Sequence, residues 1–126
     1  MKEKIDREIK RRLKDGRLSC RDAFSISEEL NVTPAEIGEA ADEMDIRLSE
    51  CRLGLFGYMP EKKIVAAKEP SDEKIREAIY ERLESGMLSC ERAWEIAGIF
   101  KTPKIEISNA CQGLGIKIIH CQLGAF

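Results

Sequence analysis

Gly16-Arg17-Leu18-Ser19-Cys20 returns seventy positions later as Gly86-Met87-Leu88-Ser89-Cys90. Around this pair, residues 5–56 align with residues 75–126 without a gap, and 18 of the 52 positions are identical. The two ends agree closely as well, because Cys51-x-Leu53-Gly54-x-Phe56 matches Cys121-x-Leu123-Gly124-x-Phe126. A repeat of this kind indicates that one module is present twice.

The repeat predicts three parts: a first module over residues 1–56, a linker over 57–74 and a second module over 75–126. The linker holds Pro60 and Pro70 together with several charges, a composition typical of connecting segments. Each module is near the size at which a single core becomes marginally stable. We therefore expect the two modules to pack against each other.

Each module predicts three helices. Ile5, Ile9 and Leu13 recur every four residues and predict a first helix that stops at Gly16. Ser19 is suited to cap a second helix. Residues 33–36, Thr-Pro-Ala-Glu, have the pattern of a capping box with proline at the first helical position, which predicts the start of a third helix.

A β-hairpin is expected after the third helix. Apolar residues alternate over 46–53, with a tight turn at Ser49-Glu50, and the second module has the same pattern around Ile119-His120. The order of helix, short strand, helix, turn, helix and hairpin, with Leu-Ser-Cys-x-x-Ala and the Thr-Pro turn, resembles prokaryotic winged helix-turn-helix domains. The fold class we expect is mainly α with short β-hairpins, as two tandem winged-helix repeats. The resemblance implies DNA binding and transcription regulation, although many such domains bind proteins instead.

Composition limits the classes of function. The 126 residues include 21 Lys and Arg against 23 Asp and Glu, a net charge of −2, which excludes a protein that coats nucleic acid by bulk charge. No apolar run approaches the roughly 20 residues of a membrane span. The charged N-terminus is not a secretory signal, and five cysteines without such a signal favour a reducing cytoplasm. We expect a cytoplasmic protein without a membrane partner.

Charge is distributed unevenly within the first module. Residues 1–21 hold nine basic and four acidic residues, whereas residues 22–50 hold one basic and nine acidic residues. Two surfaces follow as candidates. The basic first helix and the turn after it offer phosphate contacts: Lys10, Arg11, Lys14 and Arg17. The acidic third helix is either a solvated face or a docking face for a basic protein partner: Glu36, Glu39, Asp42 and Glu43.

In the family that the chain resembles, the third helix enters the major groove of double-stranded DNA. The third helix of the second module lacks the acidic cluster, and its expected outward residues are Lys104, Ser108, Asn109 and Gln112. Asn and Gln side chains can bond the edge of adenine. We therefore expect the second module to read bases, if either module does.

Four cysteines occupy equivalent places in the two modules. Cys20 and Cys90 begin the second helices, and Cys51 and Cys121 begin the expected last strands, all pointing inward. Three interpretations stay open: buried thiols that fill the core, a thiolate metal site that joins the two modules, and a redox pair or disulfide. The spacing Cys-x-x-Cys of many zinc sites is missing from the sequence. Cys111 is interpreted as core filling.

No phosphate loop, nucleophile elbow or paired-carboxylate motif is present in the sequence, and two small helical units are expected to offer little depth for a pocket. We expect a non-enzymatic protein without a cofactor. The first hypothesis is a DNA-binding regulator. The alternative is a protein–protein adaptor that uses the acidic third helix, and a cysteine-based metal or redox sensor could accompany either. The oligomeric state is left open.

Overall fold

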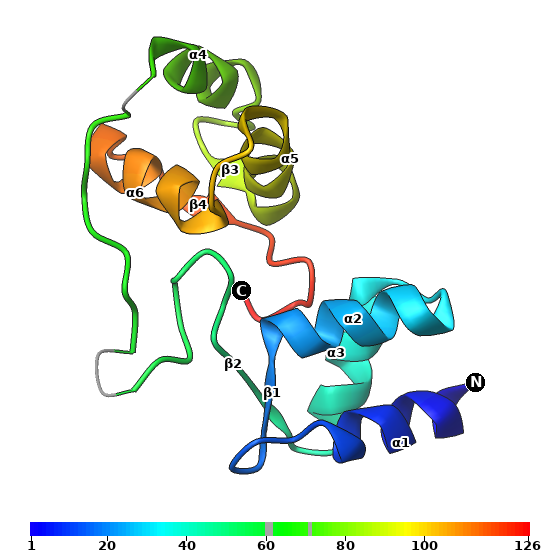
Figure 1. Cartoon of the computed structure of the whole chain (residues 1–126). Helices are drawn as coiled ribbons and strands as arrows, with labels where there is room; N and C mark the ends of the chain where they lie inside the picture. Colours follow the sequence, from blue (N-terminus) through cyan, green and yellow to red (C-terminus); the bar gives the residue numbers. More distant parts are fainter. Residues whose placement is uncertain (60–61, 71) are drawn as a thin grey trace.

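The computed structural model describes residues 1–59, 62–70 and 72–126. The described residues form six helices and four short strands, and about half of the chain is helical (Figure 1). The first repeat contains α1 (Lys2–Arg11), β1 (Arg17–Ser19), α2 (Cys20–Leu30), α3 (Pro34–Glu43) and β2 (Arg47–Ser49). The second contains α4 (Glu73–Glu81), β3 (Leu88–Ser89), α5 (Cys90–Phe100), α6 (Lys104–Leu114) and β4 (Ile118–Ile119). Pro60 of the expected linker lies outside the described residues.

The first helix is shorter than expected. It ends at Arg11, because the backbone N–H groups of Lys14 and Arg17 donate to each other's carbonyls at 2.9 and 3.0 Å. Between them, Asp15 and Gly16 both have positive φ, at 52° and 75°. Asp-Gly is a favoured pair for such a turn, which reverses the chain into β1.

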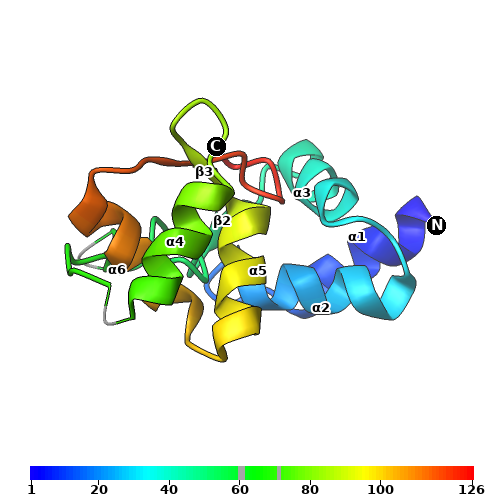
Figure 2. The same ribbon diagram turned by 90° about the horizontal axis from the view of Figure 1, so that it is seen from above.

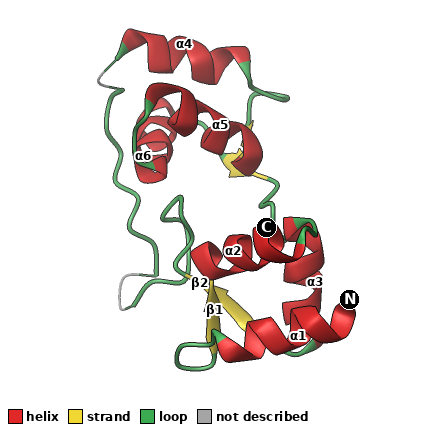
Figure 3. Cartoon of the chain, turned by 45° about the vertical axis from the view of Figure 1, so that its right-hand side comes forward, coloured by secondary structure: helices red, strands yellow, loops and turns green. Residues whose placement is uncertain are grey.

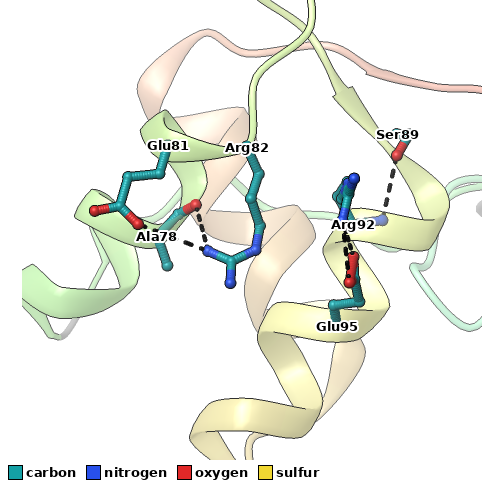
Figure 4. Close-up of polar contacts among 6 residues, drawn as sticks. All are labelled: Ala78, Glu81, Arg82, Ser89, Arg92 and Glu95. Atoms are coloured by element: carbon teal, nitrogen blue, oxygen red, sulfur yellow. Dashed lines mark hydrogen bonds and ion pairs between the residues drawn. The ribbon is translucent and has the colours of Figure 1, made fainter.

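The predicted caps of the next two helices are confirmed. The Ser19 hydroxyl accepts a hydrogen bond from the N–H of Asp22 at 3.1 Å and begins α2. Ser89 does the same for α5 by accepting from the N–H of Arg92 (Figure 4). Thr33 and Glu36 bond reciprocally at the start of α3, which is a complete capping box.

The expected hairpins are wrong. β2 pairs in parallel with β1, in the register Leu18 to Leu48 (Figure 3). β4 pairs in parallel with β3 in the same way. Residues 51–56 do not return along β2. They form a closed turn in which the N–H of Cys51 donates to the carbonyl of Phe56 at 3.2 Å and that of Gly54 to Cys51 at 2.8 Å. The three helices expected in each module are present, but the expected winged-helix arrangement is not confirmed.

Residues 121–126 form the same turn, with the N–H of Cys121 donating to Phe126 at 3.0 Å and that of Gly124 to Cys121 at 2.9 Å. We call residues 51–56 and 121–126 the tail loops. Each tail loop leaves its own repeat. The chain after β2 rises toward the second repeat, and the chain after β4 descends toward the first (Figure 1).

Each tail loop fills the core of the other repeat. Leu53 is fully buried in the cluster formed by α4, α5 and α6, and Leu123 is 3% exposed in the cluster formed by α1, α2 and α3. Gly38 of α3 lies directly against the Leu123 backbone, since a Cβ at Gly38 would be 1.8 Å from the Leu123 carbonyl oxygen. Each repeat therefore contributes its tail loop to the hydrophobic core of the other repeat.

Equivalent residues of the two repeats touch each other. Phe24 of α2 packs on Trp94 of α5, with ring centroids 4.2 Å apart, where these helices meet between the repeats (Figure 2). Phe56 and Phe126, the last residues of the two tail loops, meet edge to face at 6.2 Å. Contacts between equivalent residues are the mark of a two-fold axis, here within one chain. The prediction that the two modules pack together is confirmed.

Among the described residues, none of the helices has the length and apolar character needed to cross a membrane.

Candidate functional site

The acidic face of α3 is exposed as expected. Glu36, Glu39, Asp42 and Glu43 all face solvent. Glu43 forms an ion pair with Lys2 at 2.9 Å, and Glu29 of α2 forms one with Arg12. The Glu36 carboxylate accepts from the N–H of Thr33 in the capping box. On this face of α3, the carboxylates of Glu39 and Asp42 therefore have no bonding partner among the described residues and stay open to a partner molecule.

The expectation that Ser108 of α6 faces outward is wrong. Ser108 is 1% exposed, because it lies on the inner face of α6 beside Ile107 and Cys111. It is the equivalent of Gly38, and its hydroxyl has no hydrogen-bond partner among the described residues. This side chain cannot contact DNA.

Asn109 is occupied by the linker. Its side-chain oxygen accepts from the N–H of Ala66 at 2.9 Å, and its carbonyl accepts from the N–H of Lys68 at 3.1 Å. The linker passes so close to α6 that a Cβ at Gly113 would be 2.6 Å from the Lys68 carbonyl oxygen. Gln112 is exposed, but this arrangement does not leave Asn109 free to read a base beside it. The sequence carries no signal for this use of the linker.

Lys104 is only partly exposed, and its ammonium lies over the ring of Trp94, 4.5 Å from the centroid. This cation–π contact holds the charge against the junction between the repeats. Two arginines of the second repeat are instead bonded to polar groups of their own helices. Arg92 pairs with Glu95 at 2.9 Å, and Arg82 bonds the carbonyl of Ala78 (Figure 4).

The basic residues of the first repeat are more accessible. Lys10, Arg11 and Lys14 are exposed, and Arg17 is half-buried. Arg11 pairs with Glu8 at 3.4 Å, but Lys10 and Lys14 form no ion pair with any residue that the structure describes. The end of α1 and the turn after it thus present two exposed lysines, Lys10 and Lys14, that form no ion pair with a described residue.

The four equivalent cysteines stand at the starts of α2 and α5 and at the starts of the two tail loops. Cys20, Cys51 and Cys90 are buried, so the expected inward placement is confirmed for these three although its cause is not a hairpin, whereas Cys121 is partly exposed. Burial raises the pKa of Cys20 to about 12, and the neighbouring thiols Cys51, Cys90 and Cys121 add to this rise. Burial also raises the pKa of Cys51 and of Cys90.

Polar groups oppose that rise at three of these thiols. The backbone N–H of Arg52 lowers the pKa of Cys20 against the dominant effect of burial. The N–H groups of Leu55 and Leu53 act in the same way on Cys51. The side-chain amide of Gln122 donates to the sulfur of Cys90 at 3.5 Å. These polar groups oppose the effect of burial without outweighing it, because the pKa of each of the three thiols is raised.

A groove of about 1130 Å³ opens beside this junction, so the expectation of little pocket depth is wrong. Equivalent residues of both repeats line it, because the two tail loops meet between α3 and α6. Charges of both signs stand at its walls: Glu39, Asp42, Asp45, Arg47, Lys63 and Lys117. The feature of the sequence that relates to this groove is the near-identical sequence of the two tail loops.

Comparison of the chain with known protein families, with characterised proteins and with solved structures finds no match.

Proposed function

We propose that the chain is a non-enzymatic regulatory protein that binds double-stranded DNA through the basic surface at the end of α1. The observation that supports this proposal is the pair Lys10 and Lys14. They are exposed, free of ion pairs among the described residues, and four positions apart in the sequence. Arg11 and Arg17 flank them. Positive side chains of this kind bind the phosphate backbone and contribute most of non-specific affinity.

The contact surface in this proposal differs from the one that the winged-helix resemblance implies. The linker is hydrogen-bonded to the side chain of Asn109, and Ser108 is buried, so neither residue can contact DNA. On α3, the exposed carboxylates would repel phosphates. Base reading by α6 is therefore left with Gln112 alone. We propose a protein that grips DNA mainly by its backbone, with little discrimination between sequences.

The test is the salt dependence of binding to a duplex, measured by fluorescence anisotropy for the wild type and two matched variants. Lys10→Gln/Lys14→Gln removes two proposed phosphate contacts. Lys74→Gln/Lys101→Gln removes two exposed lysines at other places on the surface. Each lost contact lowers the slope of log affinity against log salt by about 0.9. We expect a slope smaller by roughly 2 in the first variant and an unchanged slope in the control. Equal slopes in the two variants, or no binding by the wild type at low salt, would refute the proposal.

The alternative is a protein–protein adaptor that presents α3 to a basic partner. It is supported by the exposed carboxylates of Glu36, Glu39 and Asp42, of which Glu39 and Asp42 also line the groove. A lysine-rich peptide provides the test. Its affinity should fall in Glu39→Gln/Asp42→Gln and stay unchanged in Glu77→Gln/Glu81→Gln, which alters exposed carboxylates of α4 instead. Equal affinity in both variants would exclude this face.

A further inference from the structure

The groove between the repeats differs in charge from one wall to the other. The wall on the first repeat carries three carboxylates and one guanidinium, which belong to Glu39, Asp42, Asp45 and Arg47. The described residues of the second repeat contribute an ammonium group, Lys117, and no acidic side chain. The helices of the two walls, α3 and α6, stand on opposite sides of the second tail loop (Figure 2). The groove is therefore acidic at its α3 end only.

Lys63 of the linker adds a second positive charge at the α6 end. The N–H of the next residue, Ile64, donates to the carbonyl of Gly54 at 2.8 Å. Gly54 in turn lies against α6, because a Cβ there would be 2.8 Å from Cδ1 of Ile105. The linker thus holds Lys63 beside the second repeat, and the groove runs from an acidic end to a basic end.

The charges of the groove are not neutralised within the molecule. All ion pairs among the described residues are formed by other side chains, such as Lys2 with Glu43 and Arg92 with Glu95. Both ends of the groove are therefore available to a ligand whose charges have the opposite order.

A second feature of the α6 end is the hydroxyl of Ser108. Ser108 lines the groove, is 1% exposed, and its hydroxyl has no hydrogen-bond partner among the described residues. The shared fold does not require this hydroxyl, because the equivalent residue is Gly38. Gln112, one turn further along α6, also lines the groove. A hydroxyl, an amide and an ammonium group can all donate, so this end suits a carboxylate.

The size and lining of the groove favour a peptide. Its volume of about 1130 Å³ exceeds the about 300–1,000 Å³ of most small-molecule pockets. Phe56 and Phe126 line it where the two tail loops meet, so its middle is apolar. β2 and β4 contribute Leu48 and Ile118, and in the described part of the chain each of these strands pairs along one edge only. Extended peptides bind at unpaired strand edges.

We propose that the groove binds an extended peptide segment with basic residues at one end, apolar residues in the middle and carboxylates at the other end. At the α3 end, a basic side chain of the peptide pairs with Asp42. The apolar middle packs on Phe56 and Phe126. At the α6 end, a carboxylate of the peptide accepts hydrogen bonds from Ser108 and Lys117.

This site goes beyond the proposed binding of DNA. It shares no residue with the basic surface at the end of α1, so either proposal can fail without the other. It shares the carboxylates of α3 with the adaptor alternative, but it also requires the α6 end of the groove. A purely basic partner satisfies the alternative and leaves the α6 end without a counter-charge.

The test is fluorescence anisotropy of labelled peptides with the full chain at low salt. Two peptides with blocked ends carry opposite charges at their two ends: Lys-Lys-Leu-Phe-Leu-Glu-Glu and its reverse, so that both chain directions are covered. Two controls carry one charge at both ends: Lys-Lys-Leu-Phe-Leu-Lys-Lys and Glu-Glu-Leu-Phe-Leu-Glu-Glu. We expect one of the mixed-charge peptides to bind about fivefold more tightly than either control, which is what two exposed ion pairs contribute together.

Two matched variants separate the α6 end from the rest of the surface. Lys63→Gln/Lys117→Gln should weaken the mixed-charge peptide about fivefold and should not weaken the all-lysine peptide. Lys74→Gln/Lys101→Gln removes two exposed lysines that do not line the groove, and it should leave both affinities unchanged.

Ser108→Ala separates ligand binding from folding. It should weaken the mixed-charge peptide about two- to tenfold, as the loss of one hydrogen bond does, without lowering Tm, because the hydroxyl has no partner to lose in the free protein. The proposal is overturned if the wild type binds neither mixed-charge peptide, or if Ser108→Ala binds them with full affinity. It is also overturned if both double variants weaken binding equally, or if the all-lysine peptide binds as tightly as the mixed-charge ones, which leaves docking on α3 alone.

Discussion

Replacement of Gly38 by alanine tests whether the second tail loop packs directly against α3. A Cβ at this position would be 1.8 Å from the carbonyl oxygen of Leu123 and 2.7 Å from its carbonyl carbon. Both atoms belong to the backbone, so they cannot rotate away. Alanine favours a helix over glycine by about 1 kcal/mol, but overpacking of this kind costs about 1–3 kcal/mol, and displacement of buried Leu123 adds about 1.5–3 kcal/mol. We expect Gly38→Ala to lower the free energy of unfolding by about 1.5–5 kcal/mol, which is the net of these three contributions.

Gly98 of α5 is the matched control. It is exposed in the same type of helix, and a Cβ there would meet no atom within 4 Å. Gly98→Ala should raise the free energy of unfolding by about 0.5–1 kcal/mol. Urea unfolding of both variants, followed by circular dichroism, compares them directly. If Gly38→Ala proves as stabilising as Gly98→Ala, the tail loop does not lie against α3.

Three further predictions concern the axis, a cap and the response to pH. A double-mutant cycle of Phe24→Ala and Trp94→Ala should give a coupling of about 0.5–1.5 kcal/mol in unfolding measurements, and a coupling of zero would mean that the rings do not meet. Thr33→Ala should cost about 1 kcal/mol, measured by thermal unfolding, because it breaks the capping box with Glu36; no loss would contradict the cap. Burial raises the pKa of Cys111 from 9.0 to about 12, so between these values the folded protein keeps a proton that the unfolded chain loses. The stability of the protein should therefore fall as pH rises above about 9, and less steeply in Cys111→Ala; the same slope in both would show that Cys111 is not the group responsible.

The helical framework could be predicted from sequence because its signals are local. The spacing of Ile5 and Ile9, the Ser19 cap and the Thr33–Glu36 capping box each act within one turn of helix. The duplication was equally visible, and it predicted correctly that the repeats pack together. The end of α1 at Arg11 was missed, because the Asp-Gly turn removes residues from a helix that apolar spacing would continue.

The hairpins could not be excluded from the sequence. Alternating apolar and polar residues indicate an extended segment, but they do not show which other segment it pairs with. Cys51 and Leu53 alternate as a returning strand would, yet Leu53 is buried in the second repeat. That choice depends on a core formed by residues more than twenty positions away. The same limit applied to the site: Asn109 looked free on its helix, whereas Ala66 of the linker binds it. The inward placement of Cys20, Cys51 and Cys90 and the exposed acidic face of α3 could be predicted, because local spacing decides both.

Amide hydrogen exchange of Leu53→Ala and Leu123→Ala tests the central claim, the exchange of tail loops between the repeats. Both leucines are buried, and truncation of such a side chain costs about 2–5 kcal/mol. Because Leu123 lies in the core of the first repeat, Leu123→Ala should speed exchange mainly in α2 and α3, and Leu53→Ala mainly in α5 and α6. If each change instead loosens the helices of its own repeat, the tail loops are not exchanged and the shared core is wrong.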